Sequence, residues 1–193
     1  IRLHGYDGCQ VVSDLTKGKI EAQSQAHLDP DLVPDAIIRR VGWRPIFGQA
    51  GGDQTVLRRA RVTKGDLFLF FGWYREAAMV DGIYSFARRA PDMHVIWGWM
   101  QVENIISVAD NGVAHWADYH PHVAAPEGRN NNTLYIGQGG AFRRFHEELR
   151  LTAAGHSRSI WSLPAWFYPK NSEPRFGYHT DPKRWTLDGE RTF

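Results

Sequence analysis

The 193-residue sequence contains a single cysteine, Cys9. One cysteine excludes an intramolecular disulfide and any cysteine-rich zinc site within the chain. Long apolar runs are also missing, because none approaches the ~20 residues that a membrane-spanning helix needs. No signal-peptide pattern follows Ile1, which favours a trimmed chain over a secreted precursor. We therefore expect a protein of the reducing cytoplasm with no membrane partner.

Motifs for nucleotide hydrolysis and for nucleophilic hydrolases are absent as well. The sequence has no Gly-x-Gly-x-x-Gly, no Walker-type loop and no Gly-x-Ser-x-Gly. The glycine-rich stretch GQGG, residues 137–140, lacks the lysine that phosphate loops use. These absences argue against triphosphate hydrolysis and against serine-hydrolase chemistry.

The formal net charge of +2 is too small for a strong general attraction to nucleic acid. However, 18 of the 23 basic residues are arginine, and pairs occur at 39–40, 58–59, 88–89 and 143–144. Arginine binds phosphate through two parallel hydrogen bonds and stacks on rings, which lysine does poorly. An arginine-rich codon usage would give the same bias, so both explanations stay open.

Two aromatic and β-branched stretches predict strands. GDLFLFFGWYR, residues 65–75, indicates a strand over 67–73, and HVIWGWMQVENII indicates one over 94–106. A third, short strand is expected at 133–137, and a long polar loop at 107–132. We expect short helices at 34–40 and at 142–149, the second because Phe142, Phe145 and Leu149 form one apolar stripe.

Short strands with few helices predict an α+β fold, with a small curled mixed sheet or a small β-barrel, a few short helices and long loops. The order Gly-Asp-strand in GDLFLFFGW, then strand-Gly-strand-Val in HVIWGWMQV, is similar to the PUA-like superfamily and its EVE domains, which bind modified bases. This resemblance implies that the barrel would be PUA-like. We expect one domain over 1–193. An irregular N-terminal arm, 1–52, should wrap a barrel-like core, 53–193.

Most of the chain resembles the family called nucleotide modification associated domain 3, which is grouped with phage and bacterial systems that modify DNA bases. The matching stretches are HGYDG, HLDPDL, GWRPIFGQAGG, GDLFLFFGWYR, HVIWGWMQV, HPH, NNTLYIG, LT, SIWSLPAWF, YH and RW, in this order. HGYD departs from the Lys-Gly-Phe-Asp of the family, so no role follows for His4. The resemblance implies DNA or a nucleotide as ligand and a DNA-modifying enzyme of the same system as a candidate partner. It implies neither a reaction nor a cofactor.

The aromatic strands suggest a base-binding pocket. If Phe71 and Trp73 share a face with Trp97 and Trp99, up to four rings line one cleft, and a stacked base gains about 1–3 kcal/mol per contact. The alternative is a barrel interior filled with rings. Further candidates for base contact are His94, Asn132 and Trp161, and candidates for phosphate contact are Arg75, Arg143 and Arg144.

Histidines offer a second constellation in ADYHPHVAAP. His120 and His122 would face one side of an extended chain, where Asp118 adds a carboxylate, so the three could converge on a metal or a phosphate. The alternative is a surface loop with incidental histidines. We expect the pair to act in function rather than in stability, and His179 is a fourth catalytic candidate. The tripeptide HLD, residues 27–29, formally supplies two of the three ligands of an iron-binding facial triad, which would need a distant His as well, but chance and the following proline argue against that.

The interpretation favoured by these patterns is recognition of a modified nucleobase in an aromatic pocket. One alternative is an enzyme of DNA base hypermodification that uses histidine and aspartate, with or without a metal. Another is an interaction module that recruits a modification enzyme. An enzyme needs an acid or base beside the bound ring, so we expect Trp97 or Trp99 to share a pocket with one of His94, His120, His122 and His179.

Overall fold

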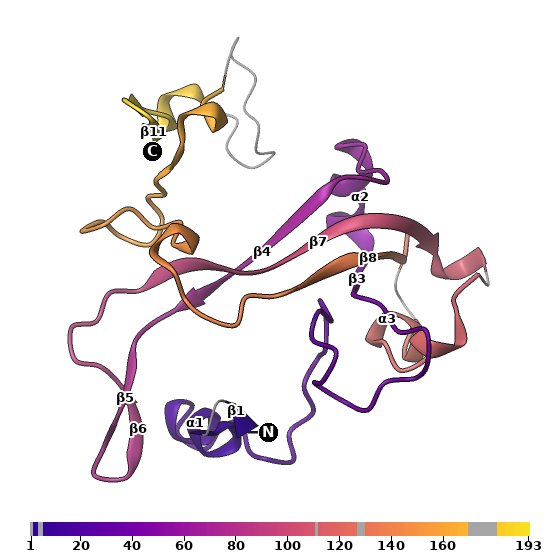
Figure 1. The fold of residues 1–193 in the computed structure, drawn as a ribbon, viewed down its shortest axis with the longest axis horizontal. Helices are drawn as coiled ribbons and strands as arrows, with labels where there is room; N and C mark the ends of the chain where they lie inside the picture. The colour runs from indigo at the N-terminus through magenta and orange to yellow at the C-terminus, as the bar shows by residue number, and fades with distance from the viewer. Residues whose placement is uncertain (1, 4–5, 111, 127–129, 170–180) are drawn as a thin grey trace.

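The computed structural model of the protein describes residues 2–3, 6–110, 112–126, 130–169 and 181–193. A four-stranded antiparallel sheet forms its centre, with the strand order β3-β8-β7-β4 (Figure 1). The bounds are β3 Ile46–Gln49, β8 Thr133–Ala141, β7 Met93–Ser107 and β4 Leu67–Tyr74. The 15-residue strand β7 pairs with β4 on one side and with β8 on the other.

Two β-bulges interrupt the pairing of β7. Phe70 lies opposite Gly98 whereas Phe71 lies opposite Ile96, so Trp97 is the extra residue of the first bulge. A second register shift, between Val102 and Asn104, occurs against β8. Bulges bend a strand and increase its twist, which curls the sheet into a half-barrel. The expected α+β class with a curled sheet is confirmed.

One face of the sheet carries the main core. Phe68 and Phe70 of β4 point into it and pack on Tyr135 of β8 and on Phe47 of β3, with ring centroids 5.1–6.1 Å apart. Fully buried Leu32, from the N-terminal arm, closes this cluster. A smaller cluster, on the opposite face of β3 and β8, consists of Ile46, Ala117, Leu134 and Ile136.

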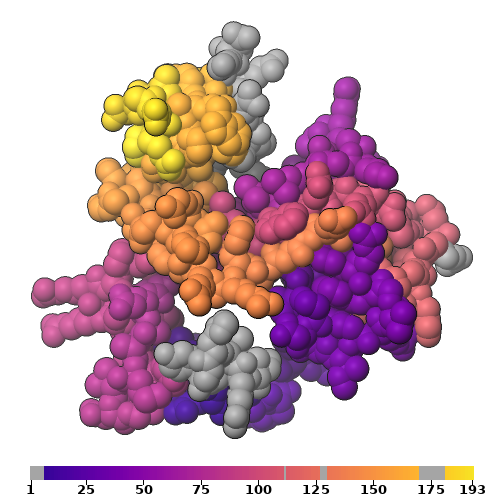
Figure 2. Space-filling model, in the orientation of Figure 1, coloured from indigo at the N-terminus to yellow at the C-terminus, as the bar shows by residue number. Residues whose placement is uncertain are grey.

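Smaller elements surround the sheet. The β5–β6 hairpin and the C-terminal segment project from the same end of the molecule (Figure 2). The strands outside the central sheet are β1 Arg2–Leu3, β2 Tyr6–Asp7, β5 Ala77–Val80, β6 Ile83–Phe86, β9 Leu163–Pro164, β10 Leu187–Asp188 and β11 Arg191–Thr192. The α-helices of the described residues are α1 Gly8–Leu15, α2 Gly51–Arg59 and α3 Pro121–Ala124. Single 3₁₀ turns are η1 Val108–Asp110, η2 His115–Ala117, η3 Glu147–Leu149, η4 Ala165–Phe167 and η5 Pro182–Arg184.

A buried ion pair anchors the N-terminal arm. Arg39 donates two hydrogen bonds of 2.6 Å to the carboxylate of Asp31, whose backbone bridges to Ile46 of β3. Tyr119 donates a third hydrogen bond to Asp31, at 2.5 Å, and burial together with this carboxylate raises the pKa of Tyr119. The arm thus holds both the sheet edge and the segment before α3.

The three predicted strands are confirmed, and each is longer than expected. The helix predicted at 34–40 is wrong, because those residues form turns around the ion pair of Arg39. The helix predicted at 142–149 is wrong except for η3: the segment continues from β8 as a loop. Helices α1 and α2 lie outside the expected positions, so the arm is not wholly irregular. Among the described residues, none of the helices combines the length and the apolarity needed to cross a bilayer.

Gly137 tests the register of β8. A Cβ there would lie 1.8 Å from the carbonyl oxygen of Gln101, so Gly137→Ala forces the paired backbones apart. We expect urea unfolding to show a loss of at least about 1–3 kcal/mol, the usual cost of overpacking. The control is Gly52→Ala in α2, where a Cβ meets nothing within 4 Å and helix propensity favours alanine. Equal stability of the two variants would contradict this register.

Candidate functional site

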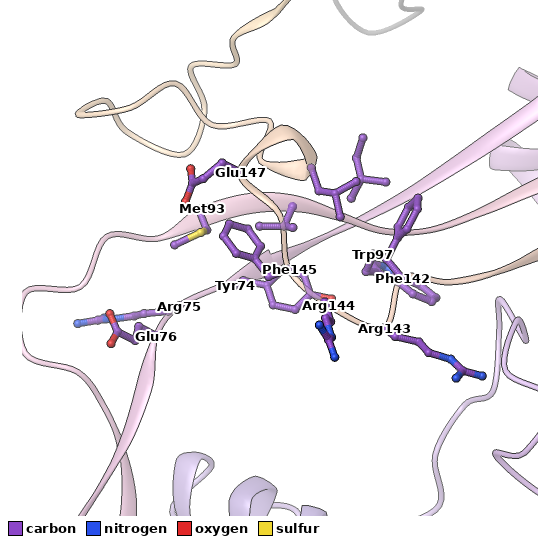
Figure 3. A pocket seen from close by; sticks show the side chains of 13 residues that line it. Tyr74, Arg75, Glu76, Met93, Trp97, Phe142, Arg143, Arg144, Phe145 and Glu147 are labelled. Atoms are coloured by element: carbon purple, nitrogen blue, oxygen red, sulfur yellow. The ribbon is translucent and has the colours of Figure 1, made fainter. Parts of the chain in front are cut away.

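A cleft of about 520 Å³ lies between the end of β4 and the loop that follows β8 (Figure 3). We call it the ring-and-arginine cleft. Four rings line it: Trp97, Tyr74, Phe142 and Phe145. The bulge of β7 turns Trp97 toward this side, and the backbone N–H of Phe142 donates to the carbonyl oxygen of Trp97 at 2.8 Å. Phe142 and Phe145 are 41% and 54% exposed, so rings that would normally be buried are available to a ligand.

Three arginines line the same cleft. Arg75 directly follows β4, whereas Arg143 and Arg144 belong to the loop and project from it in Figure 3. Neither loop arginine forms an ion pair with a carboxylate of the described residues. Of the two acids in the lining, Glu147 is paired with Arg150 at 3.0 Å. The positive charge of the loop is therefore free to meet an anion.

The cleft is better equipped for binding than for proton transfer. Burial raises the pKa of Tyr74, so its phenol is neutral at physiological pH and serves as a hydrogen-bonding ring. Neither histidine nor aspartate occurs among the described residues that line the cleft. The combination of stacking rings and unpaired guanidinium groups suits a flat, anionic ligand.

The four predicted rings of the two strands do not share one cleft. Residues directly opposite in a sheet have their side chains on the same face, so Trp73 and His94 lie together, as do Leu69 and Trp99. Phe71 lies on that face as well, whereas the bulge places Trp97 on the other one. The expectation that Trp97 or Trp99 accompanies a histidine is not met by the two clefts described here.

His94 and Trp161 meet in a second cleft, of about 510 Å³, on the opposite face of β7. We call it the His94 cleft. The indole N–H of Trp161 donates to Nδ1 of His94 at 3.0 Å, and Phe71 packs edge-on against both rings. Burial and the positive charge of Arg158 lower the pKa of His94, so its imidazole is neutral at physiological pH. Nδ1 accepts a hydrogen bond, which leaves the ring proton on Nε2.

His120 and His122 belong to a buried polar cluster with Asp29 and Asn132. Nε2 of His122 lies 3.2 Å from Oδ2 of Asp29, and Nε2 of His120 lies 3.5 Å from Oδ1, too far for a well-formed hydrogen bond. Nδ1 of His122 lies 2.5 Å from Oδ1 of Asn132, whose amide group donates to the carbonyl oxygen of His122. Gly48 makes room for this ring, because a Cβ there would lie 2.5 Å from Cγ of His122.

The hydrogen bonds indicate the charges in this cluster. The amide of Asn132 turns its oxygen toward Nδ1 of His122, and Nε2 of the same ring faces Asp29. Burial alone would raise the pKa of Asp29. The contacts with His120 and His122 and the hydrogen bond from the N–H of Gly48 outweigh burial and lower the pKa to about 2. Asp29 is therefore a buried carboxylate that keeps its negative charge.

The structure corrects the expected surroundings of the histidine pair. Both side chains are buried rather than displayed on a polar loop, with His120 fully inaccessible. Asp118 is not their partner, because it lies on the surface with Arg40 and His115. Asp29 takes its place, although 91 residues of sequence separate it from His120. Asn132 belongs to this cluster instead of to either cleft, and His179 lies outside the described residues.

The described residues include no group of three or more histidine, cysteine or acidic side chains arranged to hold a metal ion. Comparison with known proteins gives one match. The family model described as nucleotide modification associated domain 3 matches residues 2–192. No curated protein matches the chain, and no solved structure does.

His122→Ala should destabilise the protein, because it removes the ring that pairs with Asp29 and Asn132. Removing a partner of the buried Asp29 carboxylate leaves that charge poorly compensated, which costs about 3–5 kcal/mol and is measured directly by equilibrium urea unfolding. The matched control is His115→Ala: its side chain is 83% exposed, so its effect should stay within about ±0.5 kcal/mol. Similar small effects for both would mean that the buried pair adds nothing to stability.

The depressed pKa of Asp29 predicts acid sensitivity. The folded-state value of about 2 lies below the ordinary value of 3.8, so the stabilisation is complete above about pH 4 and is lost as pH falls toward 2. The loss should amount to about 2 kcal/mol. Asp29→Asn has no carboxylate at this position, so its free energy of unfolding should fall less than that of the wild type between pH 5 and pH 2. Urea unfolding repeated at steps over this pH range measures the difference. A difference between variant and wild type that stays constant over this range would contradict the assignment.

Proposed function

Because the chain belongs to the nucleotide modification associated domain 3 family, we propose that it recognises a nucleobase, ordinary or modified, in the ring-and-arginine cleft. The observation that carries the proposal is the convergence of exposed rings and unpaired arginines on one cleft. A nucleotide combines a flat aromatic base with a phosphate. The two kinds of side chain match these two parts.

The rings would hold the base. Trp97 and Phe142 come from adjoining segments that are linked by a backbone hydrogen bond, and both line the cleft. Stacking on an aromatic side chain is worth about 1–3 kcal/mol per base and accepts every base, because each has a π-face. The phenol of Tyr74 can donate to or accept from a base edge, which is the kind of contact that discriminates between bases.

The arginines would hold the phosphate. Arg143 and Arg144 lie on the loop next to Phe142, so a phosphate joined to a stacked base comes within reach of them. Their guanidinium groups form paired hydrogen bonds with phosphate oxygens. Arg75 stands at the other end of the cleft, where its guanidinium packs over Phe86 at 5.5 Å from the ring centroid.

A binding role is favoured over catalysis in this cleft. Acid–base chemistry needs a titratable group beside the reacting atom. The acids of the described lining are Glu76 and Glu147, and the second is engaged with Arg150. Catalytic roles for His120, His122 and Asp118 stay predictions, and the burial of the first two leaves little room for a substrate. Recruitment of a modification enzyme is the competing outcome if no nucleotide binds.

Phe142→Ala tests the proposal without disturbing the core. Titration of thymidine 5′-monophosphate into the wild-type protein should quench tryptophan fluorescence, because the base stacks beside Trp97. Loss of the Phe142 ring should weaken binding about tenfold, within the range of one stacking contact. The double variant Arg143→Ala, Arg144→Ala should also weaken binding and flatten its dependence on salt.

The control is Arg58→Ala, Arg59→Ala, an exposed arginine pair on α2 outside the cleft. It removes the same charge, so general electrostatic attraction falls equally in the two double variants. Only the loop pair should lose mononucleotide affinity strongly. Equal losses in both would reject the cleft as the binding site, and no quenching at millimolar nucleotide would reject nucleotide binding itself.

A further inference from the structure

The His94 cleft has the same chemical character as the ring-and-arginine cleft. Trp161, Trp185 and Phe193 supply rings to its lining, and Arg184 supplies a guanidinium. None of the described lining residues has a carboxylate side chain. Ser162, next in the chain, accepts a hydrogen bond of 3.0 Å from Arg191, so a second cation lies near the cleft. A flat anionic ligand would suit this cleft as well.

His94 fixes the orientation of a ring in this cleft. Its Nδ1 accepts the hydrogen bond from the indole N–H of Trp161, and the imidazole also contacts the backbone of Arg158. The ring is half-buried and lines the cleft. The indole of Trp161 is thereby held in place for a base to stack on it.

The two clefts lie back to back on one strand. Along β7, Met93 and Val95 to Trp97 line the ring-and-arginine cleft, whereas His94 lines the other. Figure 1 shows the C-terminal segment on one side of the β4–β7 pair and the loop after β8 on the other. At this end of the sheet β4 is the edge strand, because within the described residues it pairs with β7 alone. A ligand that reaches from one cleft to the other therefore has to pass around β4 only.

Exposed rings and arginines continue around that edge. Trp73 and Tyr74, the last residues of β4, have their side chains on opposite faces and are 62% and 44% exposed. The guanidinium of Arg158 lies 3.9 Å from the ring centroid of Trp73, and Arg75 follows Tyr74. We call these four residues the edge strip. Tyr74 and Arg75 line the first cleft, and Trp73 lies opposite His94 of the second cleft in the β4–β7 register, so the strip runs from one cleft toward the other.

We propose that the His94 cleft is a second base-binding site and that the natural ligand is a single strand of nucleic acid, which passes over the edge strip with one base in each cleft. This inference rests on the proposed function of the first cleft. A single strand fits because its unstacked bases can enter clefts on two faces, whereas bases within a duplex cannot. Binding sites of this kind commonly hold about 4–16 nucleotides.

Length dependence is the first test. Thymidine 5′-monophosphate should bind weakly, in the first cleft. Oligothymidylates of two, four and eight nucleotides should show a step in affinity once the strand reaches both clefts. Joining the two binding events should strengthen binding by about 10²-fold or more, because the second event becomes intramolecular. An eight-nucleotide strand that binds no more tightly than the monophosphate would overturn the inference.

Variants of the His94 cleft separate this inference from the proposed function. Arg184→Ala, at an exposed position, should weaken octanucleotide binding and lower the salt slope by about 0.7, the value for one phosphate contact of a single strand. Binding of the monophosphate should not change. Lys183→Ala is the control, because Lys183 shares the same 3₁₀ turn but does not line the cleft.

Trp161→Phe provides a second variant that keeps a ring but cannot donate to His94. It should weaken octanucleotide binding and leave the monophosphate affinity unchanged. If Arg184→Ala and Trp161→Phe both bind the octanucleotide as the wild type does, the second site is refuted although the first stands. If instead Phe142→Ala leaves monophosphate binding unchanged, the proposed function of the first cleft fails.

Discussion

The backbone hydrogen bonding of β7 is the constraint on which the rest of the structure depends. This strand pairs with a neighbour on both sides, and each pairing contains one extra residue. The two bulges curl the sheet, and the first one decides the face on which Trp97 lies. Without it, strict alternation along β7 would reverse the positions of Trp97 and its neighbours relative to β4. The division of the aromatic residues between two clefts follows from this single extra residue.

Two buried polar networks attach the N-terminal arm to the central sheet. Asp29 and Asp31 lie two residues apart in the arm and enter separate networks, one with His122 and the other with Arg39. Each network is buried and joins a distant part of the chain to the edge of β3. Both therefore act as tethers on the far side of the sheet from the ring-and-arginine cleft. The clefts are formed by segments that leave the sheet at its other end. Several of the rings there are exposed to solvent.

The two ends of the sheet differ in role: one stabilises the fold, and the other presents side chains to a ligand. At the buried end, His122, Asp29 and Asn132 contact one another, and His120 is fully inaccessible, so little of this cluster can reach a ligand. At the open end, Phe142, Phe145 and Trp73 are exposed despite the free energy that burial would provide. Exposed large rings beside arginines with no ion-pair partner mark a surface for ligands rather than for stability.

Residue patterns along the chain were enough to predict the three main strands, the curled α+β class, the family, and the residue types that a nucleotide site needs. Alternation and β-branched composition are local properties, so they can be read along the chain. The face that each ring occupies could not be predicted in this way, because one bulge at Trp97 reverses the alternation. Packing in the folded chain also makes residues 142–146 a loop, whose rings line the cleft beside β7 instead of forming one helical stripe. The partnership of Asp29 with His122 was likewise beyond the sequence, since no local pattern records a contact between residues so far apart in the chain.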